Sequence, residues 1–195
     1  ILEHIDYGVV LNAVTHNDDP HLSLMRDENT REIISGHMET YRVDKIWKES
    51  VCRIVSNTLT TTVASVADDF VLAHLQEDDR LHEVEFYYSA PSRVITTDGI
   101  TDGEVSSRFM RGFVDLVFRN GRKFYVADWK SNYLETGYGL ESMRKSMDHA
   151  DYHLQYKLYA VAVLRWLKQT MGDQFDPERD FGGIFYFYLR GMGMD

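Results

Sequence analysis

The sequence predicts a mixed α/β fold, in which helices pack on a central mixed sheet of about three to five strands. Two apolar runs joined by an Asn-Gly pair, at 109–131, give a hairpin pattern. Helical periodicity comes both before and after this hairpin, and a last apolar run at 181–191 predicts a buried strand. With 195 residues, 44% of them hydrophobic, the chain can build one domain with its own core.

Taken in order, the elements begin with a helix at 1–14 and a polar loop at 15–21. We then predict two helices, at 31–41 and 44–59, and an acidic loop at 76–80. A strand follows at 82–89 and is terminated by Pro91. After the hairpin, we expect two helices at 141–150 and 152–171.

Composition limits the classes of protein. Cys52 is the lone cysteine, which excludes a disulfide framework, a zinc knuckle or an iron–sulfur cluster and fits a reducing, cytoplasmic setting. No run of ~20 apolar residues exists, so we expect a soluble protein. The net charge of −10 arises entirely in the first hundred residues, whereas 108–130 carries six basic and two acidic residues. This local balance is compatible with a phosphate substrate and a cation.

The hairpin places the most chemically distinctive residues together. A two-residue Asn120-Gly121 turn pairs Arg119 with Arg122. Because side chains alternate between faces, Asp115, Asp128 and Lys130 would then share one face, with the two carboxylates diagonal neighbours about 7–8 Å apart at Cα. A three-residue loop would reverse this parity.

Two carboxylates in an apolar sheet need compensation. One interpretation is structural: Lys130 forms ion pairs with both acids, or the strand ends reach solvent. The other is a hard cation, Mg²⁺ or Mn²⁺, that polarises a phosphate and lowers the pKa of a bound water. In that case Lys130 would orient the attacking water or neutralise charge on the phosphoryl group.

A family resemblance favours the second interpretation. The segment 112–134, with Asp115, a hairpin and the triplet Asp-Trp-Lys at 128–130, resembles the nuclease signature of the RecB family in the PD-(D/E)XK superfamily. The pair Gln155 and Tyr159 resembles its Q-x-x-x-Y motif, and 181–191 and 1–7 resemble its closing strand and opening helix. The resemblance implies a restriction-endonuclease-like core, spanning nearly the whole chain.

The resemblance also implies roles for individual residues. Asp115, Asp128 and the backbone carbonyl of Trp129 would bind Mg²⁺, with Mn²⁺ possible, and Lys130 would be the catalytic lysine. Supporting or DNA-binding roles fall to Gln155, Tyr159, Glu85 and Tyr133. Two alternatives stay open: Gln155 and Tyr159 as a polar pair at a helix–sheet boundary, and Glu85 as a strand residue that faces water.

The implied activity is that of a metal-dependent exodeoxyribonuclease, which hydrolyses phosphodiester bonds while DNA double-strand breaks are processed for recombinational repair. We expect residues 1–195 to be a single nuclease domain, mostly helical over 1–80 and catalytic over 81–195. It would belong to a longer helicase–nuclease subunit with RecC-like and RecD-like partners. No G-x-x-x-x-G-K-[ST] loop is present, so we expect no ATP site. The family's metal-binding histidine would fall two residues before Ile1, and His4 would replace it poorly.

Two alternatives remain. AddB-type nucleases resemble this chain but keep a four-cysteine iron–sulfur site, which a lone Cys52 cannot form. A nuclease-like fold kept only as a DNA- or protein-docking module would be indicated by the loss of Asp115, Asp128 or Lys130, and all three are present.

Overall fold

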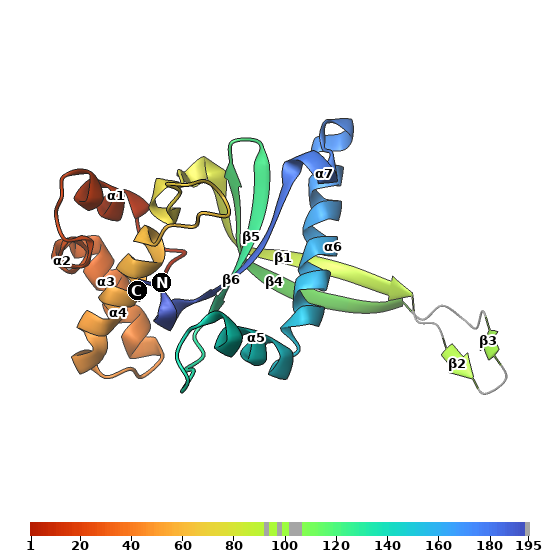
Figure 1. Ribbon diagram of the computed structural model, residues 1–195, viewed down its shortest axis with the longest axis horizontal. Coiled ribbons are helices and arrows are strands. Elements are labelled where there is room, and N and C mark those ends of the chain that lie inside the picture. The colour runs from red at the N-terminus through yellow and green to blue at the C-terminus, as the bar shows by residue number, and fades with distance from the viewer. Residues whose placement is uncertain (92–93, 97–98, 102–106, 194–195) are drawn as a thin grey trace.

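The computed structural model describes residues 1–91, 94–96, 99–101 and 107–193. A four-stranded sheet in the order β1-β4-β5-β6 crosses the middle of the molecule (Figure 1). Antiparallel pairing joins β1 to β4 and β4 to β5, whereas β6 runs parallel to β5. The predicted mixed sheet is confirmed. Its strands are β1 (Arg80–Pro91), β4 (Ser107–Asn120), β5 (Lys123–Lys130) and β6 (Phe181–Tyr188).

The helices of the first sixty residues gather at one end of the sheet (Figure 1). They are α1 (Tyr7–Thr15), α2 (Pro20–Arg26), α3 (Glu28–Thr40) and α4 (Lys48–Thr60). Short 3₁₀ turns accompany them: η1 (Lys45–Trp47), η2 (Leu72–His74) and η3 (Glu77–Asp79). The predictions for 31–41 and 44–59 are confirmed within a few residues.

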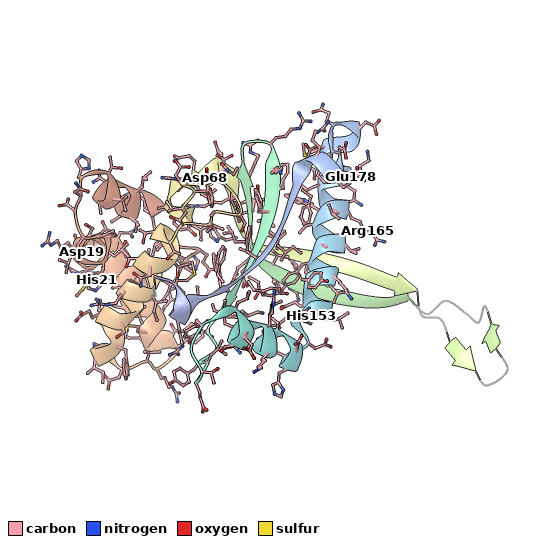
Figure 2. The ribbon with its side chains drawn as sticks, in the orientation of Figure 1. Asp19, His21, Asp68, His153, Arg165 and Glu178 are labelled. Carbon is pink, nitrogen blue, oxygen red and sulfur yellow. The ribbon has the colours of Figure 1, made fainter. Side chains whose placement is uncertain are left out.

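Two predictions in this helical end were wrong. The opening helix begins at Tyr7 rather than Ile1, because the Asp6 side chain accepts a hydrogen bond from the Gly8 N–H and caps the helix there. The expected loop at 15–21 contains the start of α2, where the Asp19 carboxylate caps the helix (Figure 2) and Pro20 occupies a first-turn position. Both are side-chain caps that hydrophobic periodicity does not report.

The far end of the sheet extends away from the helices as a long arm of β1 and β4 (Figure 1). A second pair, β2 (Val94–Thr96) and β3 (Gly99–Thr101), lies at its tip and was not predicted. The predicted end of the first strand at Pro91 is confirmed.

The hairpin between β4 and β5 exists, but its register differs from the prediction. Asn120 pairs with Lys123, so the two turn residues are Gly121 and Arg122, with Gly121 at φ +59°. Gly121 is the first of the two turn residues, and glycine adopts this left-handed conformation without strain. Each paired residue of β4 therefore lies opposite the β5 residue two positions later than predicted. Because side chains alternate between faces with a period of two, this shift does not change the face assigned to the paired residues.

Helices α5 (Leu140–His149) and α6 (Tyr152–Met171) follow the hairpin, and the second matches its predicted range. The turn η4 (Gly172–Gln174) and helix α7 (Pro177–Asp180) lead into β6, and η5 (Leu189–Gly191) follows it. The prediction of a fully buried last strand was wrong in part. Only Phe187 and Tyr188 of β6 are buried, because β6 is an edge strand.

Two hydrophobic clusters cover the two faces of the sheet. Toward the helical end, Leu116 and Phe118 of β4 and Tyr125 and Ala127 of β5 pack with residues of α1, α2 and α4. On the opposite face, α6 covers Val117 and Val126. Strands β4 and β5 are therefore buried on both faces, and the predicted site residues lie at one end of this double core. In the part of the chain that the structure describes, no helix has the length and apolar character needed to cross a membrane.

Candidate active site

The centre of the site is a buried ion pair at the end of β5. The Lys130 ammonium lies 2.5 Å from Oδ2 of Asp128, and the two residues are only 8% and 3% exposed. Both side chains point toward α6, because positions 126, 128 and 130 share one face of the strand. The predicted proximity of Asp128 and Lys130 is confirmed.

Helix α6 supplies the hydrogen bonds that this ion pair needs. Tyr159 donates from its hydroxyl to Oδ1 of Asp128 at 2.9 Å, and Gln155 donates from Nε2 to the same oxygen at 3.3 Å. Lys130 donates to Oε1 of Gln155 at 2.9 Å. Residues four apart on a helix share a face, so Gln155 and Tyr159 reach the site together. Their predicted common orientation is confirmed.

Two tyrosine rings enclose the lysine from the remaining sides. The ammonium nitrogen lies 3.8 Å from the ring centroid of Tyr152 and 4.9 Å from that of Tyr186. Tyr186 pairs with Asp128 across the parallel β5–β6 ladder, and its hydroxyl donates to Oε1 of Gln155 at 3.2 Å. The lysine is thus held by a carboxylate, an amide oxygen and two π faces, which fixes its position.

The charge of Asp128 also acts on the surrounding hydroxyls. Burial, assisted by the nearby carboxylate, raises the pKa of Tyr159 and of Tyr186 far above the ordinary value for tyrosine. Both phenols therefore remain protonated hydrogen-bond donors throughout the physiological range. They can orient the site but cannot act as bases within it.

Asp115 lies in β4, where the regular alternation of side chains between the two faces is interrupted. Val114 and Val117 both pack in the cluster beneath α6, although strict alternation would place them on opposite faces. The β4–β5 ladder stops at Leu116 and Ala127, and beyond it Oδ2 of Asp115 accepts a hydrogen bond from the Trp129 N–H at 2.7 Å. Asp115 is therefore fixed to β5 by its side chain rather than by backbone pairing.

The position of Asp115 differs from the prediction in one respect. Its carboxylate lines a cavity of about 420 Å³ formed with α3 and α4, together with Trp129. Asp128, in contrast, contacts α6. Burial is the largest cause that raises the pKa of Asp115, and the neighbouring Asp128 carboxylate raises it further, while the Trp129 N–H opposes both. The two acids are close enough to interact, as predicted, but they approach each other from different sides of β5.

One oxygen of the site lacks a hydrogen bond. Among the described residues, the buried Oδ2 of Asp128 has no donor in hydrogen-bonding geometry, although the Lys130 ammonium lies close to it. Carboxylate oxygens with free lone pairs are the ligands that hard divalent cations prefer. Asp128, together with Asp115, therefore fits a divalent metal ion by its donor set.

Two predicted residues lie apart from this cluster. The Glu85 side chain forms an ion pair with Arg111 and accepts a hydrogen bond from Tyr87 at 3.0 Å, on an exposed face of β1. This agrees with the alternative that Glu85 is a strand residue facing water. Tyr133 is 72% exposed, and its role in DNA binding stays a prediction.

Three residues near the site were not predicted from the sequence. Tyr152 and Tyr186 surround Lys130, and Glu83 lines the cavity of Asp115 and Trp129. Glu83 has a φ of +48°, uncommon for a residue that is not glycine, and this conformation falls where β1 passes Asp115. A single residue in the left-handed conformation changes where its side chain points without leaving a sequence signal, so periodicity alone could not have identified Glu83.

Comparison with known proteins agrees with this geometry. The family model described as the PD-(D/E)XK nuclease superfamily matches residues 19–193, which is most of the chain. The chain belongs to the PD-(D/E)XK nuclease superfamily. Nucleases of this superfamily generally use divalent metal ions, in keeping with the donor set of Asp115 and Asp128.

Within the superfamily, the chain is similar to the RecB subunit of the RecBCD enzyme. It is 26% identical to RecB of Buchnera aphidicola subsp. Acyrthosiphon pisum, over 95% of the chain and 17% of that relative. It is 33% identical to Escherichia coli RecB over 62% of the chain, and 38% identical to Haemophilus influenzae RecB over 57% of it, which covers 12% and 9% of those proteins. The predicted resemblance to a RecB nuclease domain is confirmed, and the chain spans less than a fifth of these relatives.

Proposed function

We propose that this domain is a metal-dependent exodeoxyribonuclease that hydrolyses DNA phosphodiester bonds. The observation that supports this most directly is the buried cluster of Asp128, Lys130, Gln155 and Tyr159 beside Asp115. Membership of a nuclease superfamily supplies the reaction class.

The reaction adds water across a phosphorus–oxygen bond. A water oxygen bonds to phosphorus, the bond to the leaving sugar oxygen breaks, and the water proton passes to solvent while the leaving oxygen gains one. Negative charge builds up on the phosphoryl oxygens in the transition state. Lys130, held at the end of β5, carries the positive charge that stabilises this build-up.

The remaining side chains keep the reacting groups in place. Gln155 and Tyr159 fix the Asp128 carboxylate, while Tyr152 and Tyr186 fix the lysine, so that little reorganisation is needed during the reaction. Asp115 and Asp128, with the Trp129 carbonyl, would hold Mg²⁺ or Mn²⁺. Such an ion would supply a Lewis acid and lower the pKa of the attacking water.

The chain's role within a whole protein follows only by similarity. We propose that it is part of a RecB-like helicase–nuclease that assembles with RecC-like and RecD-like subunits and processes double-strand ends for recombinational repair. A cytoplasmic location is in keeping with Cys52, which is buried and not paired in a disulfide.

The competing function is a DNA- or protein-docking module with little activity. The observation that favours it is the close Lys130–Asp128 ion pair, which also satisfies both charges without any metal. The two functions differ in whether the buried charges do chemistry or only hold the fold together.

The decisive experiment compares wild type with Asp128→Asn on linear DNA, with Mg²⁺, with Mn²⁺ and in EDTA. Asparagine keeps the size of the side chain and an oxygen for Tyr159 but leaves the buried Lys130 without its counter-ion, so cleavage is compared per folded molecule, well below the melting temperature of the variant. We expect metal-dependent cleavage by wild type and a loss of on the order of 10³-fold in the variant. Asp148→Asn, at an exposed position of α5, is the matched control and should cleave like wild type. Equal cleavage by Asp128→Asn, or cleavage in EDTA, would refute the proposal.

A further inference from the structure

A second group of potential metal ligands lies away from the predicted active-site acids, at the helical end of the molecule. Glu3 and His4 come from the segment before α1, and His37 comes from α3. One ligand atom from each of these three residues lies within 4.8 Å of the other two. Nε2 of His4 is 2.7 Å from Oε1 of Glu3, and the rings of His4 and His37 stack with their centroids 5.2 Å apart.

A further carboxylate, that of Glu83, lies beside the three ligands. Glu3 and His37 line the cavity of about 420 Å³, and the Glu83 carboxylate lines it too, close enough to hydrogen bond to Glu3. The unusual backbone of Glu83, at φ +48°, directs this second acid toward the cluster. Two carboxylates in contact repel each other unless a cation or a proton lies between them.

We infer that Glu3, His4 and His37 form a binding site for a divalent transition-metal ion such as Zn²⁺, distinct from the Asp115–Asp128 site. Two imidazoles and one carboxylate are a donor set for borderline metals, whereas Mg²⁺ prefers oxygen ligands alone. A tetrahedral zinc with bonds of about 2.0–2.1 Å places its ligand atoms roughly 3.4 Å apart. Small rotations about side-chain bonds close the remaining distance, and His4 is free to make them because its side chain is 53% exposed.

The fourth ligand position can be filled by Glu83 or by water. Because His37 belongs to α3 and the other two ligands precede α1, a bound ion would fasten the opening segment to α3 at the edge of the cavity that Asp115 also lines. A metal ion here therefore has a structural consequence, which is a more stable helical end, independent of DNA cleavage.

Metal binding can be measured directly on the EDTA-stripped and dialysed chain. Calorimetric titration with Zn²⁺ at neutral pH should reveal a site in wild type that is weakened by roughly tenfold or more in both His37→Ala and Glu3→Gln. Co²⁺ should give visible absorption bands in wild type that disappear in the same variants. Zn²⁺ should also raise the melting temperature of wild type more than that of either variant.

His153→Ala is the matched control, since His153 forms a 2.6 Å pair with Asp148 much like that of His4 with Glu3 but belongs to no group of three ligands among the described residues. It lies at the start of α6, away from α3 (Figure 2). The control and the double variant Asp115→Asn/Asp128→Asn should both retain the site. If His37→Ala does not fold, His4→Ala, at a half-exposed position, provides the same test. Unchanged Zn²⁺ affinity in the ligand variants, or its loss in the double aspartate variant, would overturn the inference.

Discussion

Strands β4 and β5 present two faces that are built from different side chains. The face toward the helical end carries Leu116, Phe118, Tyr125 and Ala127, all in one hydrophobic cluster. The face toward α6 begins in the same way with Val117 and Val126, and then continues into the charged pair Asp128 and Lys130. Both faces are buried, so the difference lies in chemistry rather than in exposure.

Under the proposed function, this difference separates residues that stabilise the fold from residues that would serve the reaction. Apolar burial stabilises by about 25 cal/mol per Å² and needs no partner geometry. A buried ion pair is often no more stabilising than apolar side chains of the same volume, because both ions lose their hydration. The extensive hydrogen bonding around Asp128 and Lys130 offsets that loss of hydration. It does not explain why a charged pair, rather than apolar side chains, occupies this position. The catalytic role proposed above accounts for a charged pair at this position, which stability alone does not require.

The largest effect expected on the α6 face comes from Lys130→Gln. Loss of the positive charge should lower kcat by ~10²–10⁴, while metal affinity survives, because the charge acts on the transition state. The variant should also be less stable, since Asp128 is left buried without its counter-ion. To test whether Lys130 acts in the reaction, we would measure the cleavage rate, the metal affinity and the melting temperature on one sample. A destabilised variant that still cleaves at the wild-type rate would show that Lys130 is only an ion-pair partner.

On the opposite face, Leu116→Ala should give the reverse result. Leu116 is 0% exposed, so its truncation should reduce the free energy of unfolding by about 2–5 kcal/mol. Cleavage per folded molecule should stay at the wild-type level when assayed well below the melting temperature. Denaturant unfolding and cleavage assays test the two statements separately. A folded Leu116→Ala protein without activity would show that the two faces are not independent.

The smallest effect expected is that of Asp115→Asn on stability in EDTA. Burial and Asp128 raise the pKa of Asp115, so the folded state disfavours its charged form at neutral pH. Asparagine removes this penalty and should raise the melting temperature by about 2–4 °C at neutral pH. The sign follows from linkage: with a raised folded pKa, wild type gains stability as the pH falls and Asp115 becomes protonated. The gap between variant and wild type should therefore narrow in acid. A gap that is constant from neutral to acidic pH would argue against a raised pKa.

The sequence by itself determined much of this protein, wherever a property depends on residues close together in the chain. The period of 3.6 residues located α6, and the spacing of four placed Gln155 and Tyr159 on one side of it. Asp128 and Lys130 lie two positions apart on one strand, so the alternation of side chains placed them on a common face whichever residues form the turn.

The tertiary structure decided what depends on contacts between distant segments. Tyr186 comes 56 positions after Lys130 and meets it only because β6 runs parallel to β5. Asp115 turns toward Trp129 where backbone pairing between β4 and β5 ends, and Glu83 joins its cavity through a backbone conformation that periodicity does not encode. His37 meets Glu3 because α3 packs beside the opening segment. Local patterns fix which face a side chain occupies, but only the packing of strands and helices fixes which distant side chains share that face.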